Sequence, residues 1–183
     1  MEHCEQCGFV YADVNALTLP TRLAAFGPRY QERLWPLERV ATWPETLRQR
    51  PAPTVWSALE YACHVRDVFL VQRDRLYLVL VEDTPAMTPM YRDDRVTLAR
   101  YNAQEPAEVV AQLTMAAQLI AQAFAVLDTT QLARTCRYNF PAPAVRSLLW
   151  VGQHVVHEGE HHLQDIAQVL ASVGRTAPES LAP

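Results

Sequence analysis

Apolar residues recur along the chain at spacings of three and four, the periodicity of α-helices that bury one face. No segment shows sustained alternation of apolar and polar residues bounded by hairpin turns, so the pattern predicts an all-α fold. The thirteen prolines gather between the periodic segments, and glycines are few. Four long helices in one small domain predict a four-helix bundle.

Capping signals and apolar stripes set the expected helix ends. The second helix begins with the capping box Ser57-Ala-Leu-Glu60, and Gly174 is a good terminator for the fourth. The expected ranges are 20–34, 57–81, 106–127 and 143–174. The third helix carries a stripe that is expected to be buried: Val109, Leu113, Ala116, Ile120, Phe124 and Leu127.

The remaining segments are interpreted as connections and ends. Residues 35–53, rich in proline and tryptophan, are expected to hold one or two short helical turns. A loop is expected around the charged residues 91–95. In terms of domains, residues 1–18 form an N-terminal extension, 19–174 the bundle, and 175–183 a frayed tail.

Charge and composition narrow the classes of partner. The net charge is −4 and no run of lysine or arginine occurs, which argues against nucleic acid as a partner. Residues 109–127 carry no formal charge, but Gln112, Gln118 and Gln122 interrupt them, so we expect a core helix and no membrane span. The first residues lack the pattern of a signal peptide. We therefore expect a cytoplasmic protein whose four cysteines do not form a disulfide framework.

Four of the six histidines lie within residues 154–162. His157 and His161 are one helical turn apart and can point nitrogens at one ion, whereas His162 is rotated by about 100° from His161. His64 in the second helix would complete a set of three, the usual number in catalytic zinc sites. A hydrogen-bonded core histidine at 64 and a solvated histidine face are equally good interpretations of the residues alone.

The segment Cys4-Glu-Gln-Cys7-Gly8 has the turn chemistry of a zinc knuckle. A structural zinc site needs two further ligands, and no second CxxC occurs. Three interpretations are open: a redox dithiol, an unpaired remnant, or half of a zinc site completed by His3 or by the edge formed by His154 and His162. Redox CxxC motifs usually belong to sheet-containing folds, so metal-associated or structural use of Cys4 and Cys7 is favoured.

Two longer motifs carry a resemblance to a known family. Trp56-Ser57-Ala-Leu-Glu60-Tyr-Ala-Cys-His64 is followed by His157-Glu-Gly-Glu-His161-His162-Leu-Gln-Asp165. Their order and spacing resemble the DinB/YfiT-like family of four-helix-bundle metalloproteins over about residues 19–173. The resemblance implies that His64, His157 and His161 bind one divalent cation, with zinc or nickel expected most and iron or manganese also suited to imidazole.

The same resemblance suggests an activity. The family includes thiol S-transferases that use bacillithiol or mycothiol, and a mycothiol-dependent maleylpyruvate isomerase. The isomerase-like branch has a glutamate where this chain has His157, which places the chain nearer to the all-histidine members. The expected function is activation of a low-molecular-weight thiol for transfer to an electrophilic small molecule. A hydrolase or isomerase that uses a metal-bound water, and a non-catalytic binding protein, are the alternatives; a homodimer is also open.

Further residues receive roles within this expectation. Glu60 and Asp165, each one turn from an expected ligand, would orient imidazole rings. His154 is an extra ligand or a proton carrier. Arg66 and Arg146 are candidate anchors for a carboxylate on the substrate. Ordinary surface charges or helix salt bridges are the alternative for both carboxylates.

Overall fold

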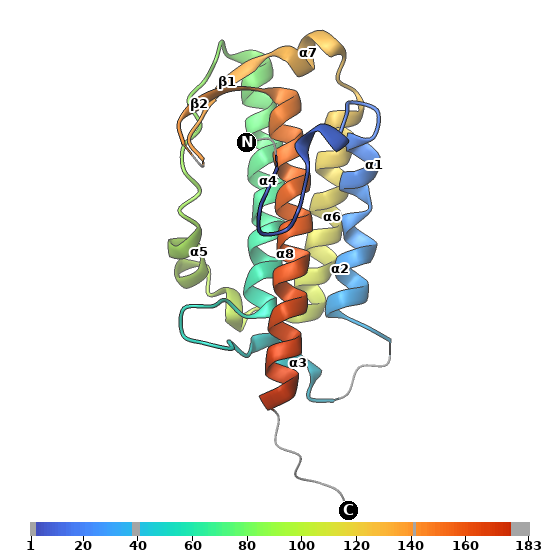
Figure 1. Cartoon of the computed structure of the whole chain (residues 1–183), viewed down its shortest axis with the longest axis vertical. Coiled ribbons are helices and arrows are strands. Elements are labelled where there is room, and N and C mark those ends of the chain that lie inside the picture. Colours follow the sequence, from blue (N-terminus) through green and yellow to red (C-terminus); the bar gives the residue numbers. More distant parts are fainter. Residues whose placement is uncertain (1–2, 38–40, 141, 177–183) are drawn as a thin grey trace, which may run out of the picture.

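The chain forms a bundle of long helices with a small two-stranded sheet at one end (Figure 1). The computed structural model describes residues 3–37, 41–140 and 142–176. In chain order the elements are η1 (Tyr11–Asp13), α1 (Leu19–Ala24), α2 (Phe26–Leu34), α3 (Trp43–Arg48), α4 (Ala58–Val81), α5 (Arg92–Leu98), η2 (Tyr101–Ala103), α6 (Pro106–Ala125), α7 (Thr129–Ala133), β1 (Thr135–Tyr138), β2 (Ala144–Ser147) and α8 (Leu148–Thr176). The predicted four-helix bundle is confirmed.

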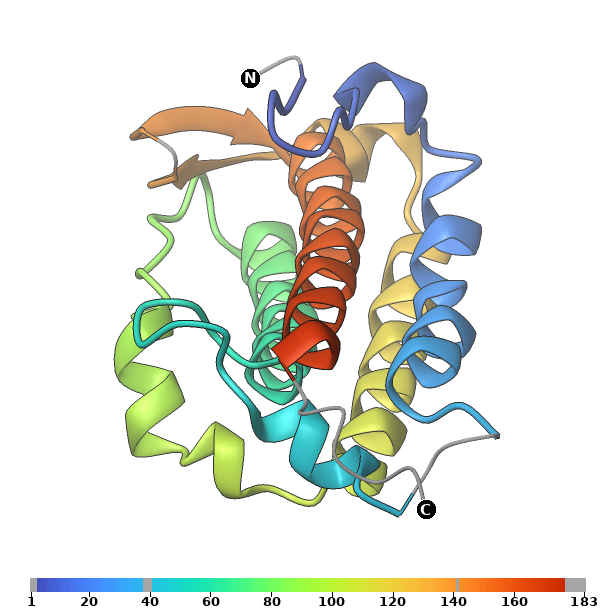
Figure 2. The ribbon, with the colours of Figure 1, turned by 60° about the horizontal axis from the view of Figure 1, so that its bottom comes forward.

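The four rods of the bundle are α4, α6, α8 and the pair α1–α2 (Figure 2). α4 packs against both α6 and α8, and α1 and α2 pack against α6. α4 and α6 run in the same direction, joined by a long crossover that carries α5 and η2 (Figure 1). This order makes α4 and α8 neighbours, so chemistry carried by the two helices can meet between them.

Local sequence explains the long helices well. Ser57 caps α4 by accepting a hydrogen bond from the Glu60 amide, and the Glu60 carboxylate accepts one from the Ser57 amide, as the capping box predicts. In α6 the stripe from Val109 to Phe124 is buried as predicted, because apolar spacing of three and four forms one face. The last predicted member, Leu127, lies beyond the end of the helix and is half-buried. The expected first helix is divided at Ala25, and Pro28, which has no amide hydrogen for a bond to Ala24, lies one turn beyond this break.

Two expectations about the secondary structure are wrong. Residues 144–147, expected to open the fourth helix, form β2, which pairs antiparallel with β1; α8 starts after it, where the Ser147 hydroxyl accepts a hydrogen bond from the Trp150 amide. Four-residue strands are too short to show as alternation in a sequence. The charged segment expected to be a loop forms most of α5, whose first turn holds Asp93 and Asp94, a favourable place for acidic side chains.

The N-terminal segment lies along α8 and contributes to the core. His3 and Val10 form an antiparallel bridge, and Phe9, Tyr11 and Val14 are buried. The expected tail, residues 175–183, lies mostly outside the described residues. Its first two residues belong to α8, which extends to Thr176. Within the described ranges, no helix combines the length and the apolar character that crossing a bilayer requires.

Candidate metal centre

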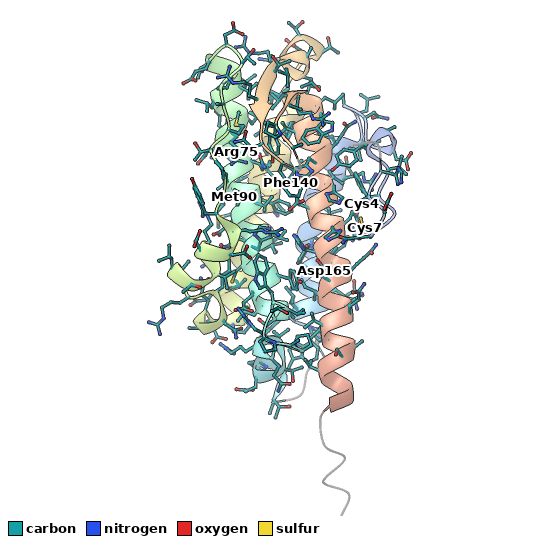
Figure 3. All side chains as sticks on the ribbon, turned by 60° about the vertical axis from the view of Figure 1, so that its left-hand side comes forward. Cys4, Cys7, Arg75, Met90, Phe140 and Asp165 are labelled. Carbon is teal, nitrogen blue, oxygen red and sulfur yellow. The ribbon has the colours of Figure 1, made fainter. Side chains whose placement is uncertain are left out.

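A cavity of about 540 Å³ lies between α4, α8 and the crossover that follows α4. Its walls come from α4, α8, the N-terminal segment, residues 87–92 and residues 138–140. Figure 3 labels Arg75, Met90 and Phe140 among its lining residues. The cavity is therefore bordered by the two helices that carry most of the histidines, and it is large enough for a small organic molecule.

Three side chains converge at the inner wall of this cavity: His64 from α4, and Glu158 and His162 from α8. Their ligand atoms lie within 4.8 Å of one another. Glu158 Oε2 is 3.8 Å from His64 Nε2 and 3.6 Å from His162 Nε2. We call these three residues the cavity cluster.

The donor geometry of the cavity cluster fits a divalent cation. The distances from the Glu158 oxygen to the two imidazole nitrogens are too long for good hydrogen bonds. Bonds of about 2.0–2.1 Å to a tetrahedral zinc ion place neighbouring ligand atoms roughly 3.3–3.4 Å apart, so the observed spacing is only slightly wider. Asp165 Oδ2 lies 2.8 Å from His162 Nδ1, which leaves Nε2 of that ring for the cluster. A carboxylate behind a histidine is the usual support of a metal-binding imidazole.

Electrostatics also prepares the cluster for a cation. Burial disfavours the ionised Glu158, but the imidazoles of His157, His162 and His64 outweigh it and hold the pKa of Glu158 well below its usual range. Burial lowers the pKa of His64. Burial also opposes protonation of His162, yet Asp165 and Glu158 raise its pKa to about 9. Without a metal, a protonated imidazole thus supplies the positive charge that a bound cation would supply in its place.

A second group forms on the neighbouring face of α8. Cys4, Cys7, His157 and His161 have ligand atoms within 4.8 Å of one another. Cys4 Sγ lies 3.8 Å from His161 Nδ1. In the view of Figure 3, Cys4 and Cys7 lie beside α8, close to the labelled Asp165. We call these four residues the knuckle cluster.

The structure thus divides the three histidines expected to share one ion. His157 and His161 are together, as their spacing predicts, but their companions are the two cysteines. Among the described residues, none of the groups with converging ligand atoms contains His64 together with either of them. The physical reason is the rotation of about 100° per residue along α8, which turns Glu158 and His162 towards α4 when His157 and His161 face the N-terminal segment. Glu158 and His162 also lie four residues apart, and that spacing was the available signal.

The other expected site residues fall into two groups. His154 lines the cavity, where Nδ1 lies 2.8 Å from the Tyr11 hydroxyl. Burial lowers the pKa of His154 to about 4, so its ring is neutral at physiological pH. Asp165 supports His162, as described above, in place of the expected His161, from whose Nε2 it lies 3.6 Å.

Arg66, Arg146 and Glu60 do not line the cavity. The Arg66 guanidinium donates to Asp67, Gln104 and Gln112. Arg146 lies over the Trp150 ring. The cations that do line the cavity are Arg75 and Arg92, which no motif in the sequence marks.

Glu60 stabilises the start of α4. It lies one turn before His64, but its carboxylate is bound elsewhere and does not support the His64 ring. Its carboxylate accepts hydrogen bonds of 2.6 and 2.8 Å from Arg50, beyond the capping box described above. We expect Glu60→Ala to lower the free energy of unfolding by about 1–3 kcal/mol, because it strands buried donors, and to leave cation affinity unchanged. Urea unfolding and metal titration measure the two effects. Glu108→Ala, at an exposed position in α6, is the control; a loss of cation affinity in Glu60→Ala alone would contradict this structural role.

The fold and the site together define a class of protein, a helix bundle in which a cluster of metal ligands faces a cavity. The family model of the DinB superfamily matches residues 30–166, and the chain belongs to this superfamily. Among solved structures the chain is similar to YfiT from Bacillus subtilis, described as a probable metal-dependent hydrolase with an unusual four-helix bundle topology. The two share 18% sequence identity with a TM-score of 0.73, over 87% of each chain. No curated protein matches the sequence.

Proposed function

We propose that the protein is a metal-dependent hydrolase whose divalent cation is held by His64, Glu158 and His162. The donor set carries the proposal: two imidazoles and one carboxylate, facing a cavity, are the set found in thermolysin and carboxypeptidase A. The description of YfiT as a probable metal-dependent hydrolase supports the same choice. When bound, a divalent cation supplies Lewis acidity that makes a water molecule nucleophilic near neutral pH.

The residues of the chain have separable tasks in this proposal. Asp165 keeps the proton of the His162 ring on Nδ1, so that Nε2 stays free for the cation. The neutral His154, whose Nδ1 lies 2.8 Å from the Tyr11 hydroxyl, lines the cavity and can form a hydrogen bond with a substrate without carrying charge into the cavity. Arg75 in the cavity wall and the exposed Arg92 at its edge provide positive charge for an anionic substrate group.

Activation of a thiol is the second candidate. A cavity of about 540 Å³ is far larger than a water nucleophile needs, and it has room for a small thiol beside an electrophile. The two arginines would suit carboxylates on such a thiol. The same cation would favour the thiolate over the thiol.

The test compares metal-free and reloaded protein. After chelation, the protein is reloaded with Zn²⁺, Ni²⁺ or Mn²⁺ and assayed with carboxylic esters, amides and phosphate esters, and separately with a thiol and an electrophile. We expect metal-dependent hydrolysis that is lost in His64→Ala and Glu158→Gln. Glu160→Gln is the matched control, because this carboxylate is on the same helix but binds Arg29 outside the cavity.

The outcomes separate the candidates. Consumption of the thiol without hydrolysis would favour the second function. Parent-like cation affinity in both His64→Ala and Glu158→Gln would show that the ligand set is wrong. A loaded protein that turns over no substrate in either assay would support a binding protein.

A further inference from the structure

The N-terminal residues 3–10 form a tight hairpin, which we call the knuckle. The Gly8 amide donates to the Cys4 carbonyl at 2.8 Å, and the Cys4 amide donates to the Phe9 carbonyl at 2.8 Å. Gly8 has a φ of +72°, a left-handed conformation that glycine adopts without strain. This turn brings the two thiols of the CxxC together, on the side of the hairpin that meets α8.

The knuckle is docked on α8 by contacts that do not involve the thiols. The Phe9 ring lies 5.5 Å from the ring of His157, centroid to centroid. The Gln164 side chain donates to the Cys7 carbonyl at 3.2 Å. The hairpin is therefore placed over the turn of α8 that carries His157 and His161, and the four side chains of the knuckle cluster meet there.

The donors of the knuckle cluster have few competing partners. Neither ring nitrogen of His157 makes a hydrogen bond within the described residues, although both are buried, and such a loss is costly unless something else satisfies them. The Glu158 carboxylate lies beside the ring, with Oε1 3.4 Å from Nδ1. Both cysteines are free thiols. The 3.8 Å between Cys4 Sγ and His161 Nδ1 is close to the roughly 3.6 Å expected between sulfur and nitrogen on a tetrahedral zinc ion.

We propose that Cys4, Cys7, His157 and His161 form a second metal site, a closed Cys₂His₂ zinc site that fastens the knuckle to α8. Four protein ligands leave no position for a substrate, which is typical of structural zinc. Two thiolates and a Zn²⁺ ion sum to zero charge, which suits a half-buried place.

Two competing sets of donors each share an imidazole with the knuckle cluster. His161, His162 and Asp165 form the first set, but Asp165 is already bonded to His162 Nδ1, and this set also leaves both thiols without a use. The second set shares His157. His154, His157 and Glu158 also have ligand atoms within 4.8 Å of one another. That set would take Glu158 from the cavity cluster, and it would leave both thiols without a use. His154 also has a hydrogen-bonding partner in Tyr11. The cysteine-containing set satisfies more donors and leaves the cavity cluster intact.

The proposed site would also support the cavity cluster. His157 and His161 alternate with Glu158 and His162 on adjoining faces of α8, so an ion on one face restrains the rotation of the helix that presents the other. Cys4 and Gln6 of the knuckle also line the cavity. Loss of the knuckle ion should therefore loosen one wall of the cavity without removing any ligand of the cavity cluster.

The test counts metal in full-length protein purified with a reductant and without chelator. We expect two equivalents per parent chain, one in the double variant C4S/C7S, and one in His64→Ala. His3→Ala, which removes an exposed neighbour, should keep two. A C4S/C7S protein that binds as many equivalents as the parent would overturn the proposal. Loss of metal in His64→Ala alone tests the proposed function, so the two proposals fail separately.

Cobalt substitution gives a readout that does not depend on a variant folding. Parent protein loaded with Co²⁺ should show the near-ultraviolet sulfur-to-cobalt charge-transfer band of a thiolate ligand. The adjacent variants form a matched pair: His161→Ala should weaken this band and His162→Ala should preserve it. Absence of the band in the loaded parent, a Cys4–Cys7 disulfide that persists under reductant, or equal spectra in the two variants would each contradict the site.

Discussion

Asp165→Asn is expected to weaken cation binding at the cavity cluster by about 10- to 100-fold while the protein stays folded. The carboxylate of Asp165 accepts the hydrogen bond from His162 Nδ1 at 2.8 Å, and an amide oxygen is a weaker acceptor. The substitution therefore makes Nε2 of His162 a poorer ligand for the cation. The knuckle cluster should be affected less, because Asp165 lies 3.6 Å from His161 Nε2, beyond a good hydrogen bond.

Competition against a chelator of known affinity measures the dissociation constants, and thermal unfolding of the metal-free protein checks the fold. Glu160→Gln is again the control, since it neutralises an acidic residue five positions earlier on α8 that is paired with Arg29 at 2.7 Å. Equal affinities in Asp165→Asn and Glu160→Gln would show that Asp165 contributes only its charge to the local field, and that the hydrogen bond does not tune the ligand.

Phe26→Ala is expected to cost about 3–5 kcal/mol of the free energy of unfolding, which corresponds to a fall in Tm of roughly 6–20 °C for a chain of this size. The Phe26 ring is fully buried and packs 5.7 Å from Phe69 and 6.2 Å from Tyr30, centroid to centroid. It also occupies the space beside Gly159, where an added Cβ would lie 2.4 Å from the ring. Urea unfolding followed by circular dichroism measures the loss.

A second variant tests whether this contact sets the position of α8. Gly159→Ala alone should destabilise the parent by about 1 kcal/mol or more, because strain against the buried ring exceeds the gain in helix propensity. In a Phe26→Ala background the same methyl group enters vacated space and should be neutral or stabilising. Additive effects in the double variant would mean that the ring yields and that the close approach at Gly159 is not needed to place Glu158.

The sequence predicted those elements whose signals are local. The capping box at Ser57, the apolar stripe of α6 and the four-helix architecture depend on residues within a few turns of one another, and the structure confirms them. The hairpin of β1 and β2 was missed because two four-residue strands gain their stability from pairing with each other and from packing at the end of the bundle. The short helix α5 was missed for a similar reason, because its one buried side chain, Val96, gives no periodic signal.

Helical spacing and turn chemistry are local properties, so the amino-acid sequence alone predicts that α8 carries a line of imidazoles and that the CxxC bends into a knuckle. Which side chains share a face with which partner depends instead on how the helices pack. The spacings 157/161 and 158/162 are both one turn, so no periodicity distinguishes them. The choice depends on how α8 is rotated against α4, and contacts from distant segments set that rotation, such as Phe26 on Gly159 and Phe9 on His157.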